Sequence, residues 1–318
     1  MLSIPVTPAV SVVIPTHNRR MLVRDAIESV LAQCNVALEL IVVDDGSIDG
    51  TAAELMPAYA DRVRWICTEN RGPAAARNAG VAIASGEFVA FLDSDDRWMP
   101  AKLERQIAFM RANPACRISQ CQERWLRNGR QVNPGQRHLK RGGDIFLESL
   151  STCLVSPSAV IMHRDLFREI GGFDETMQAC EDYDLWLRIL ADTEIALLDE
   201  ILVIRRGGHP GQLSATVPAL DRFRILSIMK LLAGLRLTPD RRVAAYAVLI
   251  EKIAIYANGL ERRGKIEAAQ ACRSIVRESS RIWREAPDAA LFEAIDLMRQ
   301  MIQQNTAMLS SAANPNTI

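Results

Sequence analysis

The sequence predicts an α/β fold, with a mixed or parallel sheet flanked by helices, followed by an all-helical C-terminal region. Two observations predict it. Short runs of apolar and β-branched residues alternate with helical segments between residues 10 and 214. From residue 219 onward, apolar residues recur at helical spacing. We therefore divide the chain into an N-terminal extension (1–9), an α/β domain (10–214), a helical region (215–309) and a polar tail (310–318) that we expect to be disordered.

Strands and helices alternate in the first part of the predicted α/β domain. Short apolar runs predict the strands, and segments with apolar residues three or four apart predict the helices. Short connections between them favour parallel strands with right-handed crossovers. The predicted strands are 10–14, 38–43, 63–66 and 87–92, and the predicted helices are 21–33, one that begins near Asp49 or Thr51, 74–84 and 98–113.

The second part of the chain is less regular before it becomes helical. Residues 116–150 are rich in arginine and glycine, which predicts a basic, loop-rich insertion. This insertion is either a solvated surface hairpin or a wall that contacts an anionic donor or acceptor. Further strands are predicted at 159–162 and 194–204, and helices at 166–170, 181–190, 219–231, 243–260, 266–283 and 289–305.

Composition narrows the functional class. The 318 residues carry 38 basic and 38 acidic side chains, so there is no basic field to suggest nucleic-acid binding. The seven cysteines are scattered without a CxxC pair, which favours reduced thiols over a disulfide framework or a zinc site. Neither a signal peptide nor an uncharged apolar run of about 18 residues is recognised. We expect a cytoplasmic protein, with peripheral contact at the inner face of the membrane left open.

Acidic residues gather where predicted strands end. Asp93, Asp95 and Asp96 follow the apolar run 88–92, and Asp44-Asp45 follows the run 38–43. Open α/β sheets bind ligands at the carboxyl ends of their strands, and clustered carboxylates suit a hard cation such as Mg²⁺. Capping of the following helices is the alternative explanation, but it does not account for two acid clusters at one sheet edge.

Two more candidate groups occur later in the chain. Glu181 and Asp182 lie in the first turn of a predicted helix, where a carboxylate is either a catalytic base or a favourable partner of the helix dipole. His209 lies in the basic, glycine-rich loop 205–214, which suggests a phosphate or metal role for a histidine that could also be inert.

These motifs together resemble family 2 glycosyltransferases of the GT-A fold. The resemblance covers about residues 10–214, and the helical region lies outside it. The motifs are Ser11-Val12-Val13-Ile14-Pro15-Thr16-His17-Asn18-Arg19, Val42-Val43-Asp44-Asp45-Gly46-Ser47, Asn70-Arg71-Gly72-Pro73-Ala74-Ala75-Ala76-Arg77-Asn78, the acids 93–96, and Glu181-Asp182 with Asp184-Leu185-Trp186. They occur in the order and at the approximate spacing of the family.

The resemblance implies a role for each residue. Pro15, Thr16 and Asn18 would hold the nucleotide, Asp45 would hydrogen-bond the base (typically uracil), and Arg77 would face the nucleotide. Asp93 would approach the ribose or the metal, and Asp95 would bind Mg²⁺ or Mn²⁺. The metal or phosphate role of His209 rests on its loop and not on the resemblance. Asp96 is left open between these two roles. The Glu181-Asp182 pair would supply the general base, with Asp182 preferred.

The implied reaction is transfer of a sugar from a nucleotide-diphosphate sugar to a hydroxyl group on a polysaccharide, lipid or protein, with inversion and metal assistance. A role in cell-envelope polysaccharide synthesis would fit. A sugar nucleotidyltransferase and a non-catalytic nucleotide-sugar-binding module are the alternatives, although the loop after the first strand lacks the glycine-rich pattern of nucleotidyltransferases. The helical region is either a bundle that supports the catalytic domain or an oligomer, or a surface that contacts anionic lipid.

Overall fold

The computed structural model describes residues 8–209, 211–212, 217–234 and 237–285. The chain divides into two compact units, with the boundary between Thr216 and Val217. Most of the predicted extension (1–9), the predicted helix 289–305 and the predicted tail 310–318 lie outside the described residues.

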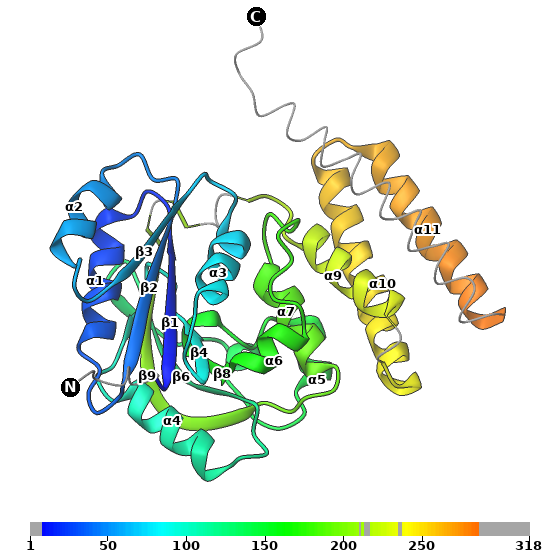
Figure 1. Cartoon of the computed structure of the whole chain (residues 1–318). Helices are drawn as coiled ribbons and strands as arrows, with labels where there is room; N and C mark the ends of the chain where they lie inside the picture. The colour runs from blue at the N-terminus through cyan, green and yellow to red at the C-terminus, as the bar shows by residue number, and fades with distance from the viewer. Residues whose placement is uncertain (1–7, 210, 213–216, 235–236, 286–318) are drawn as a thin grey trace, which may run out of the picture. The chain divides into compact units, whose positions relative to one another are not determined.

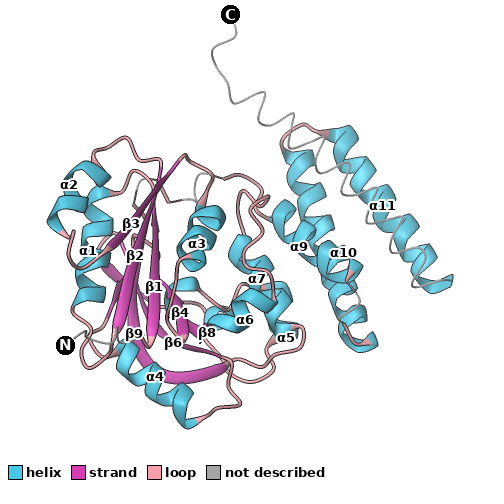
Figure 2. Cartoon of the chain, in the orientation of Figure 1, coloured by secondary structure: helices cyan, strands magenta, loops and turns pink. Residues whose placement is uncertain are grey.

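The first unit is built on one mixed sheet of nine strands, which Figures 1 and 2 show nearly edge-on. Four parallel strands form its N-terminal half, in the order β3-β2-β1-β4. They are β1 (Val10–Thr16), β2 (Leu38–Asp45), β3 (Arg64–Thr68) and β4 (Phe88–Phe91). The predicted parallel strands are therefore present, and β1 and β2 end side by side because Thr16 pairs with Asp44.

The other half of the sheet contains antiparallel pairs. Strand β8 (Val160–His163) is antiparallel to both β4 and β6 (Ile118–Arg127), while β6 runs parallel to β9 (Ala196–Gly207). Two short strands complete it: β5 (Arg97–Trp98) beside β9, and β7 (Arg130–Val132) beside β6. The sheet is thus mixed, and its acidic loop after β4 lies where the parallel half meets the antiparallel half.

Helices cover both faces of this sheet (Figure 1). On one face α1 (Arg20–Leu31), α2 (Thr51–Ala58) and α4 (Lys102–Ala112) share one apolar core with alternate residues of β1, β2 and β4. On the other face lie α3 (Pro73–Ala82), α6 (Arg164–Glu169) and α7 (Glu181–Leu190), with α5 (Phe146–Ser151) next to α7. The predicted α/β architecture is confirmed.

Two local predictions were wrong. The helix predicted from residue 98 begins only at Lys102, because Trp98 lies in β5 with its indole N–H donated to the Ser158 carbonyl, 2.8 Å away. The insertion 116–150 is not loop-rich throughout, because residues 118–127 form β6. The buried residues of β6 include the polar Ser119 and Gln120, so the sequence contains no apolar run that would predict this strand. Strand β6 is stabilised by pairing with β8 on one side and β9 on the other.

The second unit is helical where it is described, as predicted. It contains α9 (Asp221–Ala233), α10 (Pro239–Arg262) and α11 (Ile266–Glu285). Thr238 caps α10 by accepting the Arg241 N–H. By length and composition α10 could cross a membrane, and 44% of its most apolar window is buried inside the protein.

Candidate functional site

The acidic loop that follows β4 brings three carboxylates together. Asp93, Asp95 and Asp96 each offer an oxygen within 4.8 Å of the others. A tight turn, in which the Asp96 N–H bonds the Asp93 carbonyl, holds them close. Asp93 and Asp95 are partly exposed, whereas Asp96 is buried. The two accessible carboxylates are therefore the ones that can reach a ligand.

Asp96 points into the protein and connects three segments. Its Oδ2 accepts the Ser158 hydroxyl (2.6 Å), and its Oδ1 accepts the Arg206 backbone N–H (2.9 Å) at the end of β9. Burial, together with the charges of Asp95 and Asp93, raises the pKa of Asp96 well above its usual range. Asp96, whose role the sequence left open, therefore joins the acidic loop to the end of β9, three residues before His209.

The loop after β9 reaches back to the acidic loop. His209 Nε2 lies 2.8 Å from Asp95 Oδ2, and Arg19 Nη1 lies 3.2 Å from the same oxygen. Arg206 donates to the Asp95 carbonyl (2.6 Å) and pairs with Asp25 of α1 (2.7 Å). The structure therefore brings His209 to the acid cluster, as the sequence suggested. Arg19 was missed, although it closes the motif after β1.

The residues present fit a divalent cation. Two accessible carboxylates and an imidazole offer the oxygen and nitrogen ligands that Mn²⁺ accepts, and the carboxylates alone suit Mg²⁺. Two groups already lie beside Asp95 Oδ2, the Arg19 guanidinium and the His209 imidazole. Asp93, Asp95 and His209 are thus the residues that could hold a metal.

Arg77 of α3 links the acidic loop to α7. It is buried and donates to Asp93 (2.6 Å) and to Glu181 (2.7 Å). Burial disfavours its charge, but the two carboxylates outweigh that effect and hold the pKa of Arg77 above its usual value. Arg77 therefore sits between the acid cluster and the Glu181-Asp182 pair, and its guanidinium lies 5.2 Å from the Phe173 ring centre.

Three acids share the first turn of α7, and their surroundings differ. Glu181 is buried against Arg77, and burial raises its pKa despite that partner. Asp184 is buried and bonded to Arg188 (2.9 Å). Asp182 is partly exposed and has no ion pair among the described residues; its Oδ1 accepts the Tyr183 N–H (2.7 Å). Asp182 is therefore the acid of this turn best able to take a proton from a ligand.

The loops after β1 and β2 form the opposite side of the site. Asn18, with a φ of 52°, accepts the Ile48 N–H on its side chain and donates its own N–H to Ser47. Pro15 and Thr16 end β1, and the Thr16 hydroxyl is buried without a hydrogen-bond partner in the described part of the chain. The resemblance to family 2 glycosyltransferases implies that Pro15, Thr16 and Asn18 bind the nucleotide, which stays a prediction.

Asp45 is more enclosed than the sequence suggested. Its two oxygens accept the backbone N–H groups of Arg71 (2.9 Å) and Gly72 (2.8 Å), so it shapes the turn before α3. Its own carbonyl contacts His17 Nδ1 (2.8 Å). His17 also contacts Asn70, and neither side chain was among the predicted site residues, although both belong to the matched motifs. The predicted hydrogen bond from Asp45 to the nucleobase of the donor stays a prediction.

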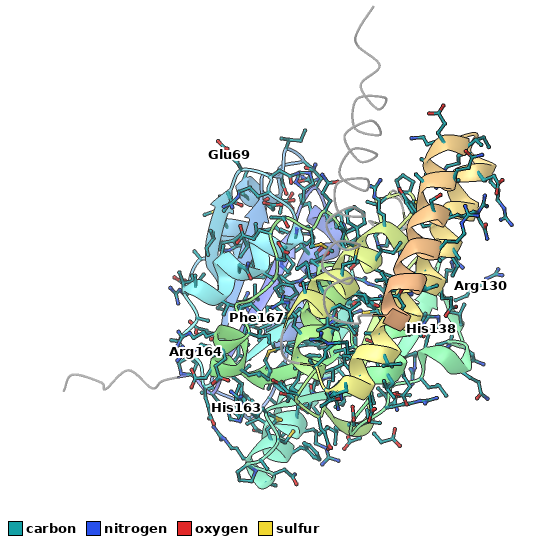
Figure 3. The ribbon with its side chains drawn as sticks, turned by 90° about the vertical axis from the view of Figure 1, so that its right-hand side faces the viewer. Glu69, Arg130, His138, His163, Arg164 and Phe167 are labelled. Carbon is teal, nitrogen blue, oxygen red and sulfur yellow. The ribbon has the colours of Figure 1, made fainter. Side chains whose placement is uncertain are left out.

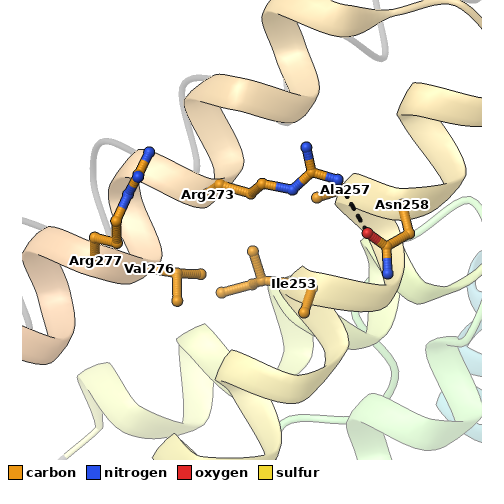
Figure 4. Close-up of a pocket in the computed structure, with 7 residues that line it drawn as sticks. Ile253, Ala257, Asn258, Arg273, Val276 and Arg277 are labelled. Carbon is orange, nitrogen blue, oxygen red and sulfur yellow. Dashed lines mark hydrogen bonds between the residues drawn. The ribbon is translucent and has the colours of Figure 1, made fainter.

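A cavity of about 310 Å³ lies in the helical unit, between α10 and α11 (Figure 4). Ile253, Ala257 and Val276 line it with carbon, and Arg273 donates to Asn258 (3.1 Å) at its edge. No carboxylate lines it, so it lacks the chemistry of the acid cluster in the first unit.

Comparison with known proteins identifies the family of the chain. Residues 11–171 match the family model described as glycosyl transferase family 2. An uncharacterized glycosyltransferase of Rickettsia typhi is 33% identical over 225 residues, which are 69% of this chain and 70% of that protein. The E. coli UDP-Glc:alpha-D-GlcNAc-diphosphoundecaprenol beta-1,3-glucosyltransferase WfgD is 33% identical over 60% of this chain and 73% of its own. Three other rickettsial relatives match over only 31–32% of their length.

Solved structures share the fold. The S. aureus TarS fragment 1–349 in complex with UDP-GlcNAc has a TM-score of 0.66 at 21% identity, covering 94% of this chain and 91% of that one. The mannosyltransferase PcManGT of Pyrobaculum calidifontis, in complex with GDP-Man and Mn²⁺, has a TM-score of 0.58 at 17% identity, covering 94% and 87%. At these identities the likeness establishes the GT-A fold.

Proposed function

The chain belongs to glycosyl transferase family 2, and on that premise we propose that it transfers a sugar from a UDP-sugar to an acceptor hydroxyl with inversion. The observation that carries the proposal is the arrangement around Arg77. One guanidinium holds Asp93 of the acidic loop and Glu181 of α7, and the next residue, Asp182, is left without an ion pair among the described residues.

Asp182 is the proposed general base. A hydroxyl that attacks a sugar carbon must lose its proton, and a carboxylate within hydrogen-bond reach can take it. Glu181 is committed to Arg77 and Asp184 to Arg188, so neither is available for that role. One base on the acceptor side supports a single displacement, and hence inversion, rather than the paired carboxylates of a two-step mechanism.

The donor would lie between the β1 and β2 loops and the acidic loop. Asn18, Thr16 and Asp45 would orient the nucleoside, while Arg77, paired with Asp93 (2.6 Å), would hold that carboxylate for the ribose or the metal. A bound Mg²⁺ or Mn²⁺, held by Asp93, Asp95 and His209, would supply the positive charge that stabilises the departing diphosphate. Asp96 holds the end of β9 in place by its bond to the Arg206 N–H.

The choice of donor and acceptor rests on the comparisons. TarS is in complex with UDP-GlcNAc, and the E. coli relative is named for a UDP-Glc donor and a diphosphoundecaprenol-linked acceptor. We therefore propose a UDP-sugar and an acceptor sugar on a lipid diphosphate, as in cell-envelope polysaccharide synthesis, at the cytoplasmic face of a membrane. No observation on this chain favours a nucleotidyltransferase or a binding module.

A nucleotide-sugar panel tests the proposal. Thermal shifts would be measured for UDP-, GDP- and TDP-sugars with and without Mn²⁺, and hydrolysis of each would be followed by release of the nucleotide. We expect stabilisation and slow hydrolysis only for UDP-sugars with the metal present. A response to GDP-sugars alone would refute the donor assignment, because PcManGT shows that this fold also accepts GDP-Man.

A further inference from the structure

The segment 124–143 carries the most one-sided charge in the first unit. It contains six basic and no acidic residues, in a chain whose net charge is zero. We call residues 124–143 the basic arm. Its first part is a hairpin, in which β6 turns into β7 at Asn128-Gly129. Both turn residues have positive φ (49° and 75°), the geometry of a tight two-residue turn that suits Asn-Gly. The arm is therefore a defined structural element.

The arginines of the hairpin are exposed and have no acidic partner. Arg124, Arg127 and Arg130 are exposed, and none of them forms an ion pair with a described residue. Arg127 and Arg130 pair directly across the two strands. Like charges in that position destabilise a hairpin, so the arrangement costs stability unless an anion lies against it. Arg130 points away from the ribbon in Figure 3.

Other exposed arginines of the same unit are neutralised. Arg105 pairs with Glu200 (2.9 Å), Arg111 with Glu87 (3.2 Å) and Arg117 with Glu169 (2.8 Å). Solvated arginines on this protein thus usually have a carboxylate beside them, and the hairpin departs from that pattern. Acids that flank the arm contact its later residues: Glu123 is buried, bonded to Trp125 (3.0 Å) and paired with Lys140 (3.4 Å), and Glu148 is paired with Arg141 (3.6 Å).

The arm is continuous with the candidate site. Trp125 pairs with Arg205 across β6 and β9, and the Arg205 guanidinium lies 5.0 Å from the Trp125 ring centre. Arg205 in turn is paired with Glu123 (3.8 Å). Burial disfavours its charge, but the negative charges of Glu123, Asp93 and Asp182 outweigh that effect and raise the pKa of Arg205. At the tip, the Asn128 N–H bonds the Gly207 carbonyl, two residues before His209. A ligand of the arm would therefore lie close to Asp182, the proposed general base, and to the acid cluster.

Apolar and aromatic side chains accompany the charges. Trp125 and His138 are partly exposed with ring centres 5.6 Å apart, and Leu139 is 46% exposed. Arginines beside a tryptophan and an exposed leucine are the combination that suits a lipid–water interface, where the charges meet phosphates and the apolar groups enter the headgroup region. Binding of a soluble polyanion would need the arginines alone.

We propose that the basic arm docks onto the anionic phosphate surface of a membrane, so that a lipid-linked acceptor presents its hydroxyl to Asp182. This deepens the proposed function and rests on it for the identity of the acceptor. The arm holds the first unit at the lipid surface. Trp125 and Arg205 lie between that surface and Asp182, the proposed general base. The docking itself requires only the arm and the phosphates.

Vesicle binding by the full chain tests the proposal. Sedimentation would be measured with vesicles of phosphatidylcholine alone and with equimolar phosphatidylglycerol, for wild type, Arg124→Gln/Arg127→Gln/Arg130→Gln and the matched control Arg105→Gln/Arg111→Gln/Arg117→Gln. Both triple variants lose the same charge. We expect wild type and control to bind only the anionic vesicles, and the arm variant to bind about 100-fold more weakly, since each arginine near such a surface is worth roughly fivefold.

Three results would overturn the proposal. They are a wild type that ignores anionic vesicles, an arm variant that binds as well as the control, and full displacement from vesicles by inorganic pyrophosphate at constant ionic strength. The last would show a site for a free diphosphate. UDP-sugar hydrolysis measured on the same proteins keeps the two proposals apart, because a hydrolysis failure in all of them refutes the donor chemistry and leaves the vesicle result to judge the arm.

Discussion

Arg77 and Glu181 form a buried ion pair of 2.7 Å, which joins α3 to the first turn of α7. Each side chain is only 6% exposed. The same guanidinium also holds Asp93, so the position of the acidic loop and the position of α7 depend on one residue. This relationship separates the two adjacent acids: Glu181 is paired with Arg77, whereas Asp182, the proposed base, accepts only the Tyr183 N–H and the Cys153 thiol (3.7 Å) among the described residues.

Replacing Arg77 should destabilise the protein strongly. Arg77→Met leaves the Glu181 carboxylate buried without its cation, which typically costs 3–5 kcal/mol. The double variant Arg77→Met/Glu181→Met removes both charges and should recover more than half of that loss. Urea unfolding measures both effects. A single variant within about 1 kcal/mol of wild type would show that the pair is not buried as described.

Asp96 should tolerate asparagine better than alanine. Asp96→Asn can still accept the Arg206 N–H and contact the Ser158 hydroxyl, so its stability should stay close to that of wild type. Asp96→Ala leaves the Arg206 N–H and the proton of the Ser158 hydroxyl without their acceptor, at about 1–3 kcal/mol for each. Urea unfolding of the two variants checks this. Equal losses would mean that charge, not hydrogen bonding, is what Asp96 contributes.

Lys102 should make stability depend on pH. It is fully buried against the Trp98 ring (3.9 Å), and burial lowers its pKa from 10.5 to about 8. Between these two values the unfolded chain binds a proton that the folded chain has released, so the free energy of unfolding rises with pH in that window. Below pH 8 the full cost of burying the charge remains.

Lys102→Met should therefore stabilise the protein. The lowered pKa corresponds to roughly 3 kcal/mol, from which about 1–2 kcal/mol of cation–π attraction to Trp98 is subtracted. We expect a gain of about 1–2 kcal/mol at pH 7, and for the variant no rise of the free energy of unfolding between pH 8 and 10. Unfolding at several pH values measures this, with Lys265→Met as the control at a partly exposed lysine. A destabilised variant would contradict the expectation.

Asp95 should be required for metal-dependent donor binding. Its carboxylate is the point where His209 and Arg19 converge, and Asp95→Ala removes it. We expect UDP binding in the presence of Mn²⁺ to fall below detection by calorimetry, while Asp165→Ala, at an exposed acid of α6, binds as wild type does. His209→Ala should weaken binding less, because two carboxylates remain. Unchanged binding by the Asp95 variant would remove the metal assignment.

Sequence patterns predicted the parallel half of the sheet because its strands are uninterrupted apolar runs such as 38–43 and 88–92. Asp93, Asp95 and His209 were also named from the sequence as candidate metal ligands, and the structure places His209 beside Asp95. Strand β6 did not follow, because its buried positions include Ser119 and Gln120 and its partners β8 and β9 come later in the chain.

Side-chain partners were beyond the sequence. That Arg77 would bond Glu181, 104 residues away, depends on how α3 and α7 pack. The same holds for the bond from the Arg206 N–H to Asp96 and for the convergence of Arg19 and His209 on Asp95. Local sequence patterns predict which helix, strand or loop contains such a residue. The packing of these elements against one another determines which acid is paired and which is not.

The central claim is that Asp182 is the base, and one comparison tests it most directly. Asp182→Asn and the control Asp192→Asn would be assayed for UDP binding with Mn²⁺ by calorimetry and for sugar transfer at saturating donor. We predict unchanged binding for both, unchanged transfer for the control, and a loss of roughly 10²–10⁴-fold in kcat for Asp182→Asn. An Asp182→Asn enzyme that transfers at the wild-type rate would contradict the account.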